Sequence, residues 1–211
     1  RGLGDVYKRQ LGGLTGIGKT RMLIRMREMG EAVLDIEGLA AHRGSAFGRL
    51  GQTRYVSPQQ FENTIAEQLK KFEGRWIWME DESRVLGSLI IPTELWQRKI
   101  ASPLYFVTIP TEDRIKMLLE DYGELDVEGL KRSILKIEKR LGGLRTKQAL
   151  EALENNEREK FILLLLTYYD KLYMNNKKER KAEPFYEFNI EDFDLDEVCR
   201  LLIAKAREVG N

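Results

Sequence analysis

The stretch Gly13-Leu14-Thr15-Gly16-Ile17-Gly18-Lys19-Thr20 fits the pattern G-x-x-x-x-G-K-[ST] of a phosphate-binding P-loop. Its glycines Gly13, Gly16 and Gly18 let the backbone turn so that successive N–H groups face one anion. Lys19 brings a positive charge within reach of the outer phosphates, and Thr20 offers a hydroxyl to Mg²⁺. A glycine-rich turn without a ligand would leave Lys19 unexplained. The stretch therefore predicts a polyphosphate site between a strand and a helix, whose positive end faces the same point.

The composition narrows the class of protein. The chain has 211 residues, 42% of them hydrophobic, and a net charge of +1, so a nucleic-acid site would have to be a local basic patch. Its single cysteine, Cys199, excludes an internal disulfide and a cysteine-built zinc site, and it suits the cytoplasm. The longest apolar run, Phe161 to Leu166, is too short to span a membrane, so we expect no membrane partner.

The first ten residues are unusual for their position. A P-loop follows a buried parallel strand, which is normally rich in Val, Ile and Leu. Arg1 to Gln10 is instead polar and contains two glycines. We interpret residues 1–10 as a non-native or truncated lead-in, with the alternative of a poor, edge-like strand.

Acidic residues follow two predicted strands. Ala32 to Glu37 is predicted as a buried strand that ends in acids, and Trp76 to Met79 precedes Glu80 and Glu82 in a pattern that resembles a Walker B strand. Strands of open α/β sheets present functional groups at their carboxyl ends. Thr20, Glu37 and Glu80 are therefore candidate Mg²⁺ ligands. The alternative is that the acids lie in ordinary solvated turns.

A glycine-containing loop over residues 38–51 carries the only histidine, His42, followed by Arg43. A guanidinium can pair with two phosphate oxygens, which makes Arg43 a candidate phosphate ligand. An imidazole is suited to acid–base chemistry, although a lone histidine is often structural. We name Lys19, Arg43 and His42 as candidate catalytic residues.

Further elements extend this pattern. Ser57-Pro58 predicts a helix start, Thr93 to Ile100 a short helix, and Pro103 to Pro110 a buried strand. Arg114, in the helix that follows this strand, is a candidate phosphate ligand by analogy with small kinases. Phe185 to Phe188 is predicted as the last strand, and Leu195 to Glu208 as the last helix, capped by Asp194.

Between these elements, residues 123–181 show no strand pattern. Helices are predicted over 126–141, 146–153 and 157–174, and a polar loop over 175–181. Basic residues gather here, and we name Arg140, Arg145 and Lys147 as candidate ligands of a phosphate group or an RNA backbone. The alternative is a solvated helix face.

The alternation of strands and helices predicts an α/β, P-loop NTPase-like three-layer fold with a mainly parallel sheet. We expect one domain over residues 11–211. Its core is predicted over 11–122 and 182–211, with a helical insertion over 123–181.

Several segments together resemble the P-loop domain of tRNA 2-selenouridine synthases. They lie at residues 12–20, 33–40 (Val-Leu-Asp-Ile-Glu-Gly-Leu-Ala), 42–48 (His-Arg-Gly-Ser-Ala-Phe-Gly), 59–63, 80–84 (Glu-Asp-Glu-Ser-Arg), 140–143 and 168–170. The block from Leu34 to Gly48 is more specific than the P-loop itself. The family commonly has Asn where Ala41 stands, a departure that leaves His42 and Arg43 in place.

The resemblance implies a two-part enzyme in which a rhodanese-like domain carries the catalytic cysteine. Such enzymes act on wobble 2-thiouridine of tRNA. They attach a geranyl group from geranyl diphosphate and then replace the geranylthio group with selenium from selenophosphate. This chain has no rhodanese motif, so the resemblance implies the phosphate-handling part, with the rhodanese domain on the same full-length chain or on a separate subunit.

The phosphate ligand stays open at this stage. It is either geranyl diphosphate or ATP, with Mg²⁺ expected in both cases. Two other functions remain: an ATP-dependent kinase of nucleotides or small metabolites, and a non-catalytic tRNA-binding subunit.

Overall fold

A computed structural model describes residues 7–42, 47, 54–122, 125–179 and 184–209. Its sheet has the order β2-β3-β1-β6-β7, and every neighbouring pair is parallel. The five strands are β1 (Tyr7–Gly13), β2 (Ala32–Leu34), β3 (Trp76–Glu80), β6 (Leu104–Thr108) and β7 (Phe185–Asn189). This parallel sheet confirms the predicted fold class, including the last strand. The β1–β3 register pairs Leu11 with Glu80, which places the acid beside the start of the P-loop.

Strand β1 lies at the centre of the sheet despite its polar composition. Arg9 is buried because its guanidinium donates to Ala206 O at 2.8 Å and lies 4.5 Å from the centre of the Trp76 ring. Gln10 is buried with its amide donating to Ser102 O at 2.9 Å. Partners supplied by the tertiary structure thus compensate the missing aliphatic residues. The origin of residues 1–10 stays a prediction, and residues 1–6 lie outside the described part.

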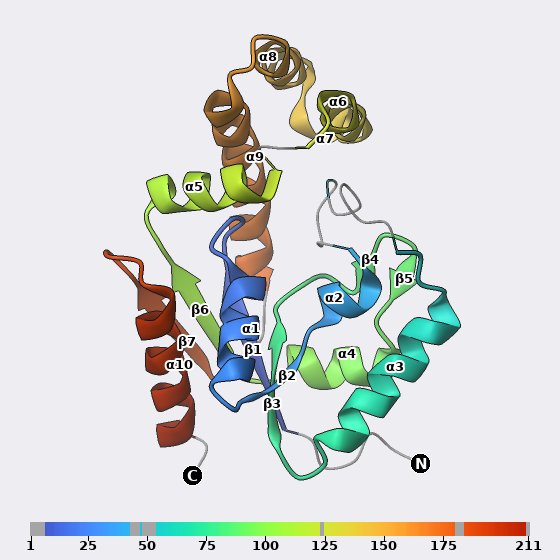
Figure 1. The fold of residues 1–211 in the computed structure, drawn as a ribbon, viewed down its shortest axis with the longest axis vertical. Helices are drawn as coiled ribbons and strands as arrows, with labels where there is room; N and C mark the ends of the chain where they lie inside the picture. Colours follow the sequence, from blue (N-terminus) through green and yellow to red (C-terminus); the bar gives the residue numbers. More distant parts are fainter. Residues whose placement is uncertain (1–6, 43–46, 48–53, 123–124, 180–183, 210–211) are drawn as a thin grey trace.

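Helices cover both faces of the sheet (Figure 1). Helix α1 (Lys19–Glu28) and helix α10 (Leu195–Val209) share one core with β1, β3 and β6. Helices α2 (Ile36–Ala40), α3 (Pro58–Lys71) and α4 (Thr93–Ile100) form a second core with β2 and β3. Two predicted helix starts are confirmed. Ser57 accepts from Gln60 N at 3.2 Å, and Asp194 accepts from Glu197 N at 2.8 Å.

One local prediction was wrong on the side of the sheet that carries the acids. The strand predicted to Glu37 ends at Leu34, because Asp35 accepts a hydrogen bond from Gly38 N at 2.7 Å and starts α2. Glu37 therefore lies in the first turn of a helix. The segment after Glu82 forms a short antiparallel hairpin of β4 (Val85–Leu86) and β5 (Leu89–Ile90).

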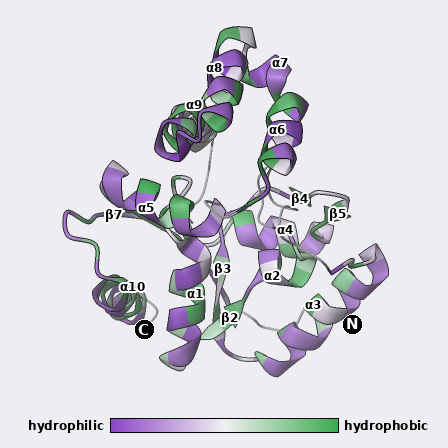
Figure 2. Ribbon diagram, turned by 45° about the horizontal axis from the view of Figure 1, so that its top comes forward, coloured by the Kyte–Doolittle hydropathy of each residue, from purple (hydrophilic) through white to green (hydrophobic). Residues whose placement is uncertain are grey.

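The remaining helices lie at one end of the molecule and share a third core (Figure 1). They are α5 (Thr111–Tyr122), α6 (Val127–Lys136), α7 (Glu138–Leu141), α8 (Gly143–Glu154) and α9 (Arg158–Glu179). In Figure 2, hydrophilic and hydrophobic residues alternate along α6 and α8, as expected of helices buried on one side.

Three boundaries in this region differ from those predicted. Helix α8 begins at Gly143, three residues before the predicted start. The helix expected over residues 126–141 is divided at Ile137 into α6 and α7. The loop predicted from Asn175 was wrong for its described part, because α9 continues to Glu179. No helix in the described ranges is both long and apolar enough to cross a membrane.

Candidate functional site

The P-loop connects β1 to α1 and exposes the free N–H groups of the first helical turn. Gly16 and Gly18 adopt left-handed conformations with φ of 82° and 78°. A Cβ at Gly16 would lie 2.8 Å from Leu118 Cδ1, so α5 packs too closely for a larger residue. Helix α1 begins without a side-chain cap, which leaves its N-terminal N–H groups available to an anion.

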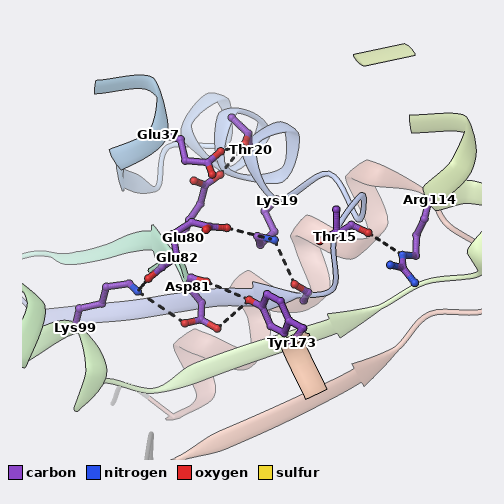
Figure 3. A network of polar contacts seen from close by, with 11 residues as sticks. Thr15, Lys19, Thr20, Glu37, Glu80, Asp81, Glu82, Lys99, Arg114 and Tyr173 are labelled. Atoms are coloured by element: carbon purple, nitrogen blue, oxygen red, sulfur yellow. Dashed lines mark hydrogen bonds and ion pairs between the residues drawn. The ribbon is translucent and has the colours of Figure 1, made fainter. Parts of the chain in front are cut away.

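Lys19 lies between the loop and the acidic strand end (Figure 3). Its Nζ donates to Gly13 O at 3.2 Å and lies 3.7 Å from Glu82 Oε1. The ring centre of Tyr173, on α9, lies 5.7 Å from the same Nζ. The cation is thus held at the loop by groups from three parts of the chain.

Thr20, Glu37 and Glu80, the three predicted metal ligands, meet at one point. Thr20 Oγ1 donates to Glu80 Oε1 at 2.7 Å and lies 3.5 Å from Glu37 Oε2. Glu80 is 1% exposed, and its second oxygen, Oε2, has no hydrogen-bond partner among the residues that the structure describes. An unpaired buried carboxylate oxygen is costly, and a cation beside it would remove the cost.

The electrostatics of this centre agree with its geometry. Burial, and then the neighbouring carboxylates, raise the pKa of Glu37 well above its ordinary value. The pKa of Glu80 is raised for the same reasons, and its hydrogen bond with Thr20 opposes the rise. Carboxylates held this close repel one another when they are ionised, and a divalent cation between them would offset this repulsion.

The residues present fit Mg²⁺ bound together with a phosphate. Among the described residues, no group of three or more His, Cys, Asp or Glu side chains is arranged to hold a metal ion. Mg²⁺ is commonly held by one or two carboxylates, waters and substrate phosphates, so a complete protein cage is not required. Thr20, Glu80 and Glu37 would supply the protein oxygens, and the P-loop would hold the phosphates beside them.

A second layer of polar contacts supports the acidic strand end. Tyr173 Oη donates toward Asp81, with distances of 3.1 Å to Asp81 O and 3.3 Å to Asp81 Oδ2. Lys99, which is 1% exposed, donates to Glu82 O at 2.7 Å and lies 3.8 Å from Asp81 Oδ1. Lys99 has no signature in the sequence, because a lysine in an amphipathic helix gives no sign of burial.

Arg114 is placed against the P-loop, but through the loop's backbone. Its Nε donates to Thr15 O at 2.8 Å, while its two terminal nitrogens donate to Asp170 at 2.9 and 2.6 Å. These contacts give the residue a structural role. Its role as a phosphate ligand stays a prediction.

The other predicted site residues fall in different places. His42 lines the same cleft as the P-loop and Glu80, whereas Arg43 lies outside the described residues. Arg140 lines this cleft from α7, and Arg145 is exposed on α8. Lys147 is also exposed on α8 and lies 3.7 Å from Glu151. The cleft has a volume of about 970 Å³. It is lined by the P-loop, by residues 80–84 at the carboxyl end of strand β3 and by α9.

Comparison with known proteins identifies relatives of this chain. Residues 9–198 match the family model described as the tRNA 2-selenouridine synthase AAA domain. The tRNA 2-selenouridine synthase of Pseudomonas syringae is 34% identical over 206 residues, which cover 82% of this chain and 54% of the relative. That of Pseudomonas putida strain GB-1 is 35% identical, covering 93% of this chain and 59% of the relative. The enzyme of Cupriavidus pinatubonensis is 44% identical over 117 residues, which cover 53% of this chain and 30% of the relative.

Proposed function

The chain belongs to the tRNA 2-selenouridine synthase family, and we propose that it is the part of such an enzyme that binds and activates a diphosphate. It spans about half the length of curated relatives that it matches, 54% in the Pseudomonas syringae protein. The activity of the whole enzyme is therefore part of the proposal. The rhodanese-like domain that carries the selenation step would be supplied by the same full-length chain or by a separate subunit.

One observation carries the proposal. The free N-terminus of α1, the Lys19 ammonium and the part-buried Thr20–Glu80 pair converge on one point of the cleft. Backbone N–H groups and a lysine bind phosphate oxygens, while a hydroxyl and carboxylates bind the cation that accompanies them. This is a site for a Mg²⁺–diphosphate, with geranyl diphosphate as the proposed donor.

In the proposed reaction, the sulfur of wobble 2-thiouridine attacks C1 of geranyl diphosphate. A C–S bond forms, the C–O bond breaks, the bonding electron pair leaves with the diphosphate, and the N3 proton of the base passes to solvent. Lys19 and the P-loop N–H groups stabilise the negative charge that grows on this leaving group. Bound Mg²⁺ would add to that stabilisation by charge neutralisation. In a second step, the selenium of selenophosphate attacks C2 of the base and displaces the geranylthio group as geranylthiol, and water then cleaves the Se–P bond and releases phosphate.

The helices beyond α5 are proposed to hold the tRNA. Arg140 lies on the rim of the cleft, and Arg145 and Lys147 follow on α8. Basic residues that track a phosphate backbone would bring the wobble base toward the P-loop. Tyr169 and Tyr173 line the same cleft from α9.

A nucleoside analysis tests the proposal. The chain is incubated with 2-thiouridine tRNA, Mg²⁺ and either geranyl diphosphate or ATP, and the nucleosides are then analysed by mass. Geranylthiouridine in the first mixture supports the proposal. Phosphoryl transfer that depends on ATP would indicate a kinase, and tight tRNA binding without any turnover would indicate a binding subunit.

Two variants sharpen this test. Lys19→Ala should abolish geranyl transfer, because the departing diphosphate loses its nearest cation. Lys116→Ala is the matched control, since Lys116 is an exposed lysine of α5 that pairs with Asp113 at 3.1 Å. Unchanged transfer by Lys19→Ala would exclude the assignment.

A further inference from the structure

The cleft that contains Lys19 has two sides of different chemistry. On the α1–α5 side, Arg21 pairs with Glu120 and Asp121. Helix α1 also contributes Ile24, an apolar residue, to the lining of the cleft. The other side is formed by Trp96 and Ile100 of α4 and by Leu104 of β6. The carboxylates and Lys19 lie where the two sides meet.

The α4 side is continuous with the phosphate site. A Cβ on Gly12, just before the P-loop, would lie 2.7 Å from Leu104 Cδ1 and 3.2 Å from Asp81 Oδ2. Trp96 and Ile100 are four residues apart on α4, so they project from the same face of the helix. The apolar side chains thus begin within one residue of the loop that would hold the diphosphate.

Part of this side presents apolar surface to water inside a concave site, whereas Leu104 is only 1% exposed. Ile100 is 45% exposed although it lines the cleft, and Leu172, which lines it from α9, is 38% exposed. Covering such surface with a hydrocarbon is favourable, because the gain follows the apolar area removed from water. Ligand clefts commonly combine an apolar lining with a few polar groups that fix orientation.

Two donors on this side are directed into the protein. The Gln10 amide donates to Ser102 O at 2.9 Å, and the Lys99 ammonium donates to Glu82 O at 2.7 Å. A nucleobase buried here would need hydrogen-bond partners for its ring nitrogens, and leaving them unpaired is costly. A hydrocarbon chain has no such requirement. The α4 side therefore favours a lipid-like group over adenine.

We propose that Trp96, Ile100 and Leu104 form the subsite for the hydrocarbon chain of an isoprenoid diphosphate. The proposal rests on the proposed function, which places the diphosphate at the P-loop. The subsite adds the direction in which the hydrocarbon chain of the ligand extends from the phosphate site, toward α4 and away from Ile24. It also identifies the residues that distinguish a prenyl donor from ATP.

Binding measurements separate the subsite from the phosphate site. The chain with Mg²⁺ is titrated with inorganic pyrophosphate, geranyl diphosphate and ATP in a calorimeter. Ile100→Asp should weaken geranyl diphosphate binding by about tenfold or more, since a charge replaces apolar contact, and should leave pyrophosphate binding unchanged. Ile24→Asp is the matched control, because Ile24 is 44% exposed and lines the other side of the same cleft.

Three results would overturn the subsite. They are equal affinity of the unmodified chain for geranyl diphosphate and pyrophosphate, loss of geranyl diphosphate binding in Ile24→Asp only, and tighter binding of ATP than of geranyl diphosphate. Failure of the proposed function has another signature, in which the unmodified chain binds no pyrophosphate at all. Thermal unfolding of both variants verifies that they are folded, as expected for substitutions at partly exposed positions.

Discussion

Arg114 connects Asp170 of helix α9 to the carbonyl of Thr15 in the P-loop. Its guanidinium donates to Asp170 Oδ2 at 2.9 Å, to Asp170 Oδ1 at 2.6 Å and to Thr15 O at 2.8 Å. The arginine side chain is 4% exposed and that of the aspartate 30%. The helices that are proposed to bind tRNA are therefore fixed to the phosphate loop by one buried cation.

Asp170→Ala should destabilise the chain by about 1–3 kcal/mol, because it leaves the Arg114 guanidinium buried without its partner. Urea unfolding measures the change. Asp113→Ala is the control, since Asp113 pairs with Lys116 at the surface and should cost less than about 1 kcal/mol. Equal effects of the two substitutions would show that the buried pair adds nothing specific.

At alkaline pH and without ligand, the Glu80→Gln variant should have a higher free energy of unfolding than the wild type. Burial and the nearby carboxylates raise the pKa of Glu80 from an ordinary 4.5, so the folded state holds the proton more tightly than the unfolded state. The contribution of this group is complete below pH 4.5 and is lost as the pH rises through the higher folded value. The glutamine variant lacks this loss and should gain about 1–3 kcal/mol near pH 8.

The same substitution should weaken the Mg²⁺-dependent binding of pyrophosphate, since an amide is a poorer cation ligand than a carboxylate. Thermal unfolding from pH 5 to 9, with and without Mg²⁺ and pyrophosphate, measures both effects. Glu94→Gln is the control, because Glu94 is an exposed residue paired with Arg98 on the surface of α4. Parallel pH profiles for wild type and Glu80→Gln would contradict the prediction.

Ala41→Asn should stabilise the chain by about 0.5–1 kcal/mol. Ala41 ends α2 in the left-handed region, with φ of 48° and ψ of 47°, where asparagine is better tolerated than alanine. Ala101 ends α4 at φ −91° and ψ 0°, so Ala101→Asn should bring no comparable gain in denaturant unfolding.

Arg145→Ala should lower tRNA affinity at low salt and reduce the slope of log affinity against log salt by about 1. Arg145 is exposed at the start of α8, which Figure 1 places at the α6–α8 end of the molecule. Arg200 is the matched control, because it is 65% exposed on α10, which packs on α1. A salt slope that falls equally in Arg200→Ala would argue against α8 as the tRNA surface.

The sequence by itself determined the P-loop and most of the elements around it, because these depend on local signals. Glycines at fixed spacing, the Ser57-Pro58 helix start and the period of apolar residues act within a few positions. The same local signals placed the Thr20 hydroxyl and the Glu37 and Glu80 carboxylates near the carboxyl ends of the strands. In the structure these three side chains are in contact.

Only the tertiary structure decided which polar residues are buried and what they contact. Arg9 can lie in a central strand because two residues distant in sequence contact its guanidinium. The Trp76 ring lies against it, and the Ala206 carbonyl accepts its hydrogen bond. Arg114 meets Asp170 across 56 positions, and the apolar side of the cleft joins α4 to β6. Such contacts have no local signature, because the burial of a charge depends on partners that folding brings from elsewhere in the chain.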